Sequence, residues 1–253
     1  MPALLTGFTA FVCFLGAFLI VRRLQRFLPE DHLSDESSTS VRVGIAVVST
    51  LSGLVLGLVL SSMKMNFDNV QRDVRRFGTE LIMVDTALRS CEAIGVTARQ
   101  QLLEYARAAL NGTWPADGSG VIVDDRAAAM LLQRTDRSIV QLATTDPATA
   151  YYADRARNSM DKLINLRATI ISENKAFLQP AFIVVVVLWF TLLFGGFGYR
   201  APSNYTVTTS MLCAAIAIAS AITLMMELDG AFTGLITVSS EPLRDAIATL
   251  AQP

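Results

Sequence analysis

The sequence contains few of the residues from which metal sites and catalytic centres are built. Its 253 residues include one histidine, His32, and three cysteines, Cys13, Cys91 and Cys213, none at metal-ligand spacing. A structural zinc site takes about four such donors, and a disulfide framework takes several cysteine pairs. We therefore expect no metal site, no cofactor and no disulfide framework, and we interpret His32 as a solvated loop residue. Because no paired carboxylates or nucleophile–base set appear, we also expect no enzymatic activity.

Charged residues are scarce as well. They make up 17% of the chain, against about 25% in soluble domains. The formal net charge of −1 gives no electrostatic argument for a nucleic-acid partner. Hydrophobic residues make up 52% and are concentrated in four blocks, with almost all of the charge between the blocks. This pattern is typical of a protein whose main partner is the lipid bilayer.

Each of these blocks has about the length needed to cross a membrane. A bilayer core requires about 20 apolar residues, and lipid cannot satisfy backbone N–H and C=O groups, so each block must be helical. Arg22, Arg23 and Arg26 follow the first block instead of preceding it, which argues against a cleaved signal peptide. We predict an all-α, multi-pass protein of the plasma or inner membrane. Its two transmembrane helix pairs are expected at residues 4–21 with 43–63 and at residues 177–199 with 207–228.

The second block has small and hydroxyl residues at every fourth position: Ser49, Gly53, Gly57 and Ser61. This spacing places them along one stripe of a helix. One interpretation of the stripe is close helix–helix packing through small residues. The other is the lining of a narrow pore, with Leu56 and Leu60 as hydrophobic constrictions. The stripe alone leaves both interpretations open.

The middle of each block is free of Asp, Glu, Lys, Arg and His. Proton relays, voltage sensors and ion-coupled pumps usually need ionisable groups inside the membrane. Active ion-coupled transport is therefore disfavoured, although sodium coupling through backbone and hydroxyl oxygens stays open.

The segment between the two pairs, residues 64–176, is predicted to be a helical soluble domain. It begins with an apolar seam in alternating three- and four-residue steps: Phe67, Val70, Val74, Phe77, Leu81, Val84 and Leu88. Such a seam is typical of a coiled coil or a helical bundle. Whether the seam is buried within one chain or between subunits stays open at this stage.

Further helices are predicted in this domain from their start signals. One begins at Thr97, with Gln100 completing a capping box, and another covers residues 124–143. A third begins at Asp146-Pro147, with proline at the first helical position. We predict an antiparallel bundle that is continuous with the second and third spans. The expected division is a first helix pair at 1–63, the bundle at 64–176, a second hairpin at 177–228 and a C-terminal interfacial segment at 229–253.

The number of spans constrains the topology. An even number separates the N-terminus from the bundle and the bundle from the C-terminus, so we expect all three on the same side. Arginines in the short loops, including Arg42 and Arg200, favour a cytoplasmic location for those loops. Basic residues near the membrane on the bundle side oppose this assignment. On balance the charges favour an external bundle, but they do not settle which side carries it.

Five short fragments spread over nearly the whole chain carry a family resemblance. They are Val21-Arg22-Arg23, Leu54-Val55-Leu56-Gly57, Asn66-Phe67-Asp68, Gly112-Thr113-Trp114-Pro115 and Leu228-Asp229-Gly230-Ala231-Phe232-Thr233-Gly234. With these fragments the chain resembles the bacterial bestrophin-like family of four-span membrane proteins, which is remotely similar to the bestrophin anion channels. The family often has a proline before the aromatic residue, where this chain has Ala231.

The resemblance implies a function. Bestrophins are pentameric, with a helical cytosolic domain and a pore lined by the second helix. By this analogy the chain forms a homo-oligomer that passes inorganic ions, and the stripe from Ser49 to Ser61, together with Phe67, lines the pore. The same analogy places the soluble domain in the cytoplasm.

The segment after the fourth span supplies pore-mouth candidates. Asp229-Gly230 reads most simply as a helix end with glycine at its C-cap. Alternatively, Glu227 and Asp229 form acidic rings at a pore mouth, which would favour cations over anions. Ser240 is predicted to cap a short amphipathic helix that buries Leu243, Ile247 and Leu250.

Two function classes follow from these observations. The first is an oligomeric ion channel with the second helix lining the pore and with selectivity unassigned. The second is a non-conducting membrane-anchored sensor or scaffold that binds a partner through its helical bundle.

Overall fold

The computed structural model describes residues 2–27, 35–115, 126–142, 146–173, 180–199 and 201–252. Within these ranges every regular element is a helix, which confirms the predicted all-α class. Among the described residues, four helices are long and apolar enough to cross a membrane: α1 (Pro2–Leu24), α2 (Asp35–Arg89), α6 (Pro180–Gly198) and α7 (Tyr205–Asp229). His32 lies outside the described residues, as do residues 174–179, where the bundle was predicted to continue into the third span.

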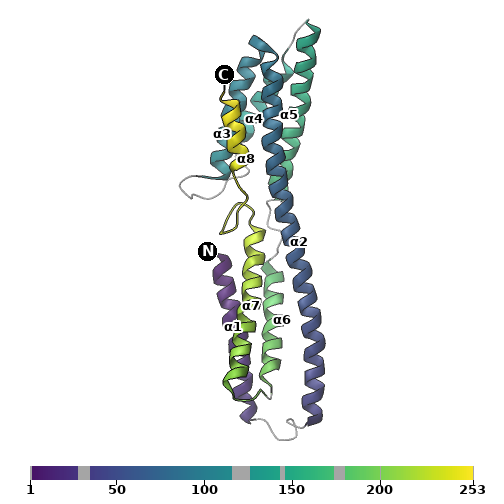
Figure 1. Cartoon of the computed structure of the whole chain (residues 1–253), viewed down its shortest axis with the longest axis vertical. Helices are drawn as coiled ribbons and strands as arrows, with labels where there is room; N and C mark the ends of the chain where they lie inside the picture. The colour runs from purple at the N-terminus through teal and green to yellow at the C-terminus, as the bar shows by residue number, and fades with distance from the viewer. Residues whose placement is uncertain are drawn as a thin grey trace. The chain divides into compact units, whose positions relative to one another are not determined.

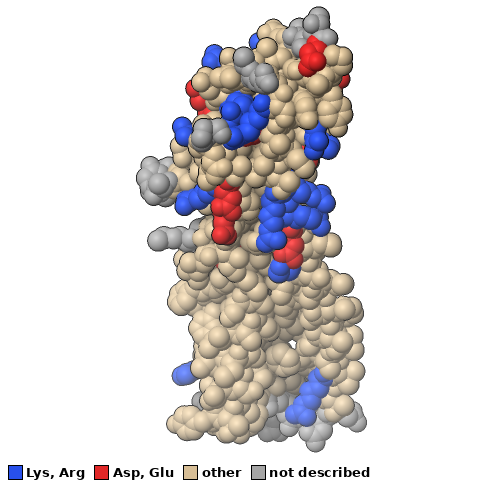
Figure 2. Space-filling model, turned by 45° about the horizontal axis from the view of Figure 1, so that its top comes forward, with Lys and Arg blue, Asp and Glu red and all other residues tan. Residues whose placement is uncertain are grey.

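The chain divides into two compact units. The membrane unit comprises Met1–Met65 and Ala176–Asp229, and the bundle unit comprises Asn66–Lys175 and Gly230–Pro253. The helix α2 contributes to both. On the face that Figure 2 shows, charged side chains gather in the upper part of the view, whereas the lower part is almost uncharged except for basic residues near the bottom. A broad uncharged surface of this kind is suited to lipid.

The membrane unit is built around α1, with α6 and α7 packed beside it (Figure 1). Aromatic side chains form its centre, since the ring of Phe14 stacks on that of Phe194 at a centroid distance of 5.3 Å. Helices also approach closely through glycine, because a Cβ at Gly7 would overlap the hydroxyl of Thr223 on α7. Small residues and van der Waals packing of this kind drive helix association in a membrane, because the lipid tails are as apolar as the helix surfaces.

The bundle unit combines the second half of α2 with α3 (Val96–Thr113), α4 (Arg126–Val140), α5 (Pro147–Glu173) and α8 (Glu241–Leu250). All of the seam residues from Phe67 to Leu88 are buried. The seam is therefore covered by the chain itself, which resolves the alternative that the spacing left open. Helix α8 lies directly on α2, because a Cβ at Gly78 would come within 2.6 Å of the Pro242 carbonyl oxygen.

Three predicted helix starts can be compared with the structure. The capping box at Thr97 is wrong: α3 begins at Val96, its N-cap is Gly95, and no side chain bonds to the cap. The reason is a 3-10 turn, Glu92–Gly95, which leads straight into α3 and leaves Thr97 inside the helix. Ser240 likewise makes no cap bond, and the Glu241 amide donates instead to the hydroxyl of Ser239 at 3.1 Å.

The start of α5 is confirmed. Pro147 is its first residue, and the Asp146 carboxylate accepts bonds from the amide and the hydroxyl of Thr149 at 2.8 and 2.7 Å. Because these bonds favour the charged carboxylate, with the hydroxyl bond contributing most, they lower the pKa of Asp146. A cap of this kind satisfies amide groups that the first turn of a helix leaves open.

A buried carboxylate ties α2, α3 and the C-terminal segment together. Asp85 on α2 is 2% exposed and accepts bonds from Arg89 Nε at 2.6 Å and from Arg99 Nε at 2.9 Å. The same arginines donate onward to the C-terminal segment, Arg89 to the carbonyls of Thr249 and Gln252 and Arg99 to that of Gln252. One carboxylate thus orients two guanidinium groups that hold the end of α8.

A second acidic residue of the bundle, Glu173, lies where the charged form of its carboxyl group is disfavoured. The Oε2 atom of Glu173 at the end of α5 is buried and has no hydrogen-bond partner among the residues that the structure describes. Burial raises the pKa of Glu173, and the nearby Asp73 carboxylate raises it further, with Arg72 opposing. The folded protein therefore holds this proton more tightly than the unfolded chain, so the destabilising contribution of Glu173 grows as pH rises through the raised pKa.

Replacing Glu173 with glutamine should accordingly raise the unfolding temperature at about pH 7, because the unfolded chain carries the carboxylate freely in water, whereas burial in the folded protein disfavours its charge. At about pH 4, where the wild-type side chain is protonated, variant and wild type should unfold alike. Thermal unfolding of the detergent-solubilised protein at both pH values measures this difference. Glu104→Gln on α3, an exposed position, serves as the control. A stabilisation by Glu173→Gln that is equal at both pH values would contradict the electrostatic cause.

Candidate ion-conducting helix

The N-terminal half of α2 is the least covered of the four spans. Only 6% of its most apolar window is buried, whereas the windows of the other spans are 22–33% buried. Its exposed large side chains include Val43, Val47, Val48, Leu51, Leu54 and Leu58. An apolar surface of this length in a membrane protein is covered either by lipid or by another protein subunit.

A narrow strip of α2 does face the rest of its own chain. Ile45 and Leu56 pack against the aromatic core of the membrane unit, and Ser52 and Met63 are buried, at 2% and 1% exposure. Leu56, Ser52 and neighbouring valines line a small crevice with residues of α6, among them Trp189. This strip fixes how α2 is rotated about its own axis, and thereby which residues it leaves uncovered.

The predicted Gly/Ser stripe lies mostly outside that strip. Gly53, Gly57 and Ser61 are exposed, and no described atom lies within 4 Å of a Cβ built at either glycine. Packing within one chain therefore does not explain these two glycines. We refer to Gly53, Gly57 and Ser61 together as the open face. Two interpretations of the open face remain, packing between subunits and pore lining.

The other candidates on this helix are placed differently. Ser49 is half-buried, and its hydroxyl, like that of Ser52, has no hydrogen-bond partner among the described residues. Leu56 points toward its own chain, about 100° around the helix from Gly57, and Leu60 is half-buried. The structure thus brings the two glycines and Ser61 to one open face and separates Leu56 from them.

The remaining sequence candidates are largely covered by the chain. Phe67 is 7% exposed and Glu227 is 5% exposed, whereas Asp229, the last residue of α7, is half-buried. The helix end predicted at Asp229-Gly230 is confirmed by the end of α7. Acidic rings formed by Glu227 and Asp229 stay a prediction.

Two of the fragments that carried the family resemblance meet in the bundle unit. Trp114 and Phe232 form an edge-to-face pair with a centroid distance of 5.3 Å, and the Trp114 indole N–H donates to the Val238 carbonyl at 2.9 Å. The backbone between Phe232 and Val238 turns back on itself. The Val238 amide donates to the Ala231 carbonyl, and Gly234 within this segment has a φ of 104°. Sequence spacing gave no sign of this contact between distant segments.

A family model described as the Bestrophin-like domain matches residues 11–243. The chain belongs to the Bestrophin-like family. The resemblance seen in the fragments is therefore confirmed. No curated protein matches the chain.

Solved structures share the fold of this Bestrophin-like chain. Two variants of a bacterial Bestrophin homolog from Klebsiella pneumoniae superpose with TM-scores of 0.64 and 0.60, covering 96% and 99% of this chain and 97% of theirs. A structure described as a membrane protein gives a TM-score of 0.61 with 96% and 97% coverage. Each is 14% identical to this chain. The agreement over nearly the full length shows a shared fold.

Proposed function

We propose that the chain is one subunit of an oligomeric ion channel whose pore is lined mainly by the N-terminal half of α2. The observation that carries the proposal is the open face of Gly53, Gly57 and Ser61 on a helix that its own chain leaves largely uncovered. The membership of the chain in the Bestrophin-like family supports the same assignment.

The chemistry of the open face suits the lining of a passage. Glycine adds no side chain, so the passage stays wide there and the backbone lies near its surface, while the Ser61 hydroxyl offers a polar contact to an ion. A ring of identical subunits, the usual symmetry of such assemblies, would bring the open faces together around a central axis. By analogy with bestrophins the proposed number of subunits is five.

Selectivity is proposed from the same analogy. An anion channel is expected, because bestrophins conduct anions and because the open face has no carboxylate. Acidic rings at Glu227 and Asp229 would instead favour cations. We also propose that the N-terminus, the bundle unit and the C-terminal segment lie on one side of the membrane, because an even number of proposed spans separates them.

Bilayer recording of the purified protein tests the proposal. We expect ionic current from the wild type, and Ser61→Asp should raise the ratio of cation to anion permeability, because a ring of carboxylates attracts cations. Ser61→Asn, which has nearly the same shape without the charge, is the matched control and should leave the ratio near that of the wild type. Absence of current under varied voltage, pH and calcium, from a protein that cross-links only as a monomer, would favour the scaffold alternative.

A further inference from the structure

The side of α2 that carries the open face continues into the bundle half of the helix. Because α2 is one unbroken helix, residues about five full turns, or 18 positions, apart lie on the same side of it. Gly57 and Arg75 are related in this way, and so are Ser61 and Thr79. Arg75 and Thr79 are both exposed. The same side of α2 is therefore uncovered by its own chain in both halves.

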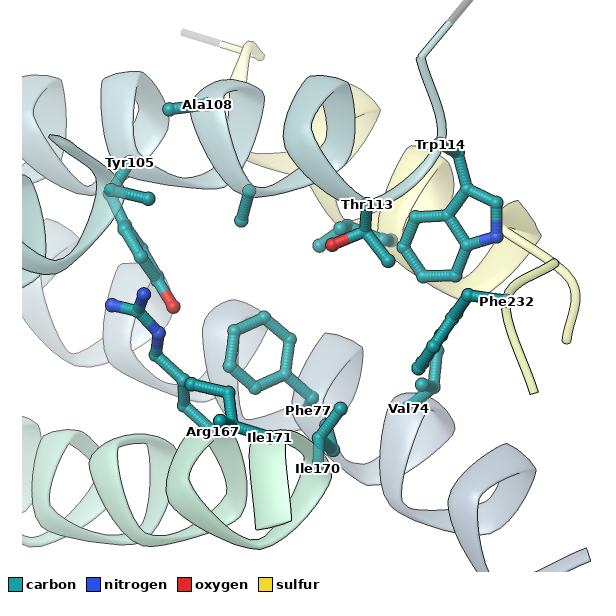
Figure 3. Close-up of a pocket in the computed structure, with 13 residues that line it drawn as sticks. Val74, Phe77, Tyr105, Ala108, Thr113, Trp114, Arg167, Ile170, Ile171 and Phe232 are labelled. Atoms are coloured by element: carbon teal, nitrogen blue, oxygen red, sulfur yellow. The ribbon is translucent and has the colours of Figure 1, made fainter. Parts of the chain in front are cut away.

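The opposite side of the bundle half is buried, which fixes the rotation of the helix. Val74 and Phe77 line a cavity of about 50 Å³ inside the bundle, together with Tyr105 and Arg167. Figure 3 shows the Phe77 ring directed toward this interior. Phe77 lies two residues after Arg75, so the two side chains are about 160° apart around the helix. Arg75 therefore points away from the bundle core.

The exposed side of this half is basic. Its exposed charged residues between positions 66 and 79 are Asp68, Arg72, Arg75 and Arg76. Arg76 is paired with the Asp73 carboxylate at 3.6 Å, and Arg72 donates to the neutral side chain of Asn69. No acidic side chain of the described residues forms an ion pair with Arg75. Positive charge therefore exceeds negative charge on this side, with Arg75 as its main contributor.

Fixed cations along a narrow passage raise the local concentration of anions and exclude cations. In the ring of subunits proposed above, every copy of α2 would present Arg75 at the same height, about 27 Å along the helix from Gly57. We propose that Arg75, supported by Arg72, forms a basic ring around the continuation of the passage and concentrates small inorganic anions such as chloride. This inference rests on the proposed channel function and names the residues that set its selectivity.

The position of Arg75 along α2 favours dissolved ions over lipid headgroups as its partner. Arg75 lies 12 residues beyond Met63, where the predicted second span ends, which is about 18 Å along the helix axis. The headgroup layer on each side of a bilayer is only about 5–8 Å deep. For a helix that follows the membrane normal, Arg75 is therefore beyond the headgroups and in the aqueous phase.

Single-channel recording in bilayers of uncharged phosphatidylcholine tests the ring. Arg75→Gln should lower the chloride conductance about twofold or more at about 10 mM salt and leave it unchanged at about 1 M, because the Debye length falls from about 30 Å to about 3 Å. Arg134→Gln, at an exposed arginine on α4, is the matched control and should change neither value. Thr79→Lys adds a cation on the same side of α2 and should raise the conductance at low salt, which misfolding cannot imitate.

The outcomes separate this inference from the channel proposal. A wild type that conducts, with conductance at low salt unchanged by Arg75→Gln and by Thr79→Lys, would overturn the basic ring alone. A wild type without current would overturn both. An equal loss in Arg134→Gln would show that any surface charge suffices and would also refute the ring. An effect of Arg75→Gln seen only in bilayers that contain anionic phosphatidylglycerol would assign Arg75 to the lipid surface instead.

Discussion

Gly57→Leu should remove most of the channel current while leaving the unfolding temperature at or above that of the wild type. Each subunit would project an isobutyl group into the passage, narrowing it at one height and making it more hydrophobic there. Stability should not suffer, because no described atom lies within 4 Å of the new Cβ. Leucine also favours a helix over glycine by about 1 kcal/mol.

Gly44→Leu is the matched control for this experiment. Gly44 lies on the same helix and also has open space around its Cβ, but it is about 140° around the helix axis from Gly57. The control should therefore conduct like the wild type. Bilayer recording and thermal unfolding of both variants make the comparison, and a Gly57→Leu protein that conducts normally would exclude the open face as the pore lining.

Asp85→Ala should lower the free energy of unfolding of the bundle by about 3 kcal/mol, because it leaves two partly buried guanidinium groups without their shared carboxylate. Arg89 and Arg99 retain 30% and 23% exposure, so water offsets part of the loss and the effect should fall at the low end of the range for buried pairs. Denaturant unfolding of the detergent-solubilised protein measures the change.

The same substitution should act locally on the C-terminal segment. Arg89 and Arg99 hold the Gln252 carbonyl, so hydrogen exchange in α8 should accelerate more than in α4. Asp154→Ala is the control, since Asp154 pairs with Arg157 but is 69% exposed, and its loss should cost less than about 1 kcal/mol. Equal losses of unfolding free energy in the two variants would show that the burial of Asp85 does not determine its contribution to stability.

The spans and the seam were predictable because each depends on a local pattern. Twenty or so apolar residues must form a helix in lipid, and the steps from Phe67 to Leu88 already define one buried side of a helix, which the structure buries completely. The family could be recognised from short fragments such as Gly112-Thr113-Trp114-Pro115, because these fragments resemble segments found in members of the family.

The features that were missed depend on contacts between distant segments. Nothing in the spacing of Asp85 and Arg99, or of Trp114 and Phe232, indicates that they meet, and the cavity beside Arg167 exists only once the bundle has closed. The cap at Thr97 was predicted from a local signal, and it failed because the preceding 3-10 turn had already started the helix. The stripe on α2 was visible, but only the packed membrane unit shows that Leu56 lies apart from the open face.

The order of residues on α2 has a further geometric consequence. Leu58 follows Gly57 directly and is 63% exposed, so the two positions differ by about 100° around the helix and by about 1.5 Å along it. A turn of α2 by that angle would exchange a hydrogen atom for an isobutyl group at nearly the same height. In a ring of subunits, the bore of the passage would then be set by the rotation angle of each helix, without any change in the spacing between subunits.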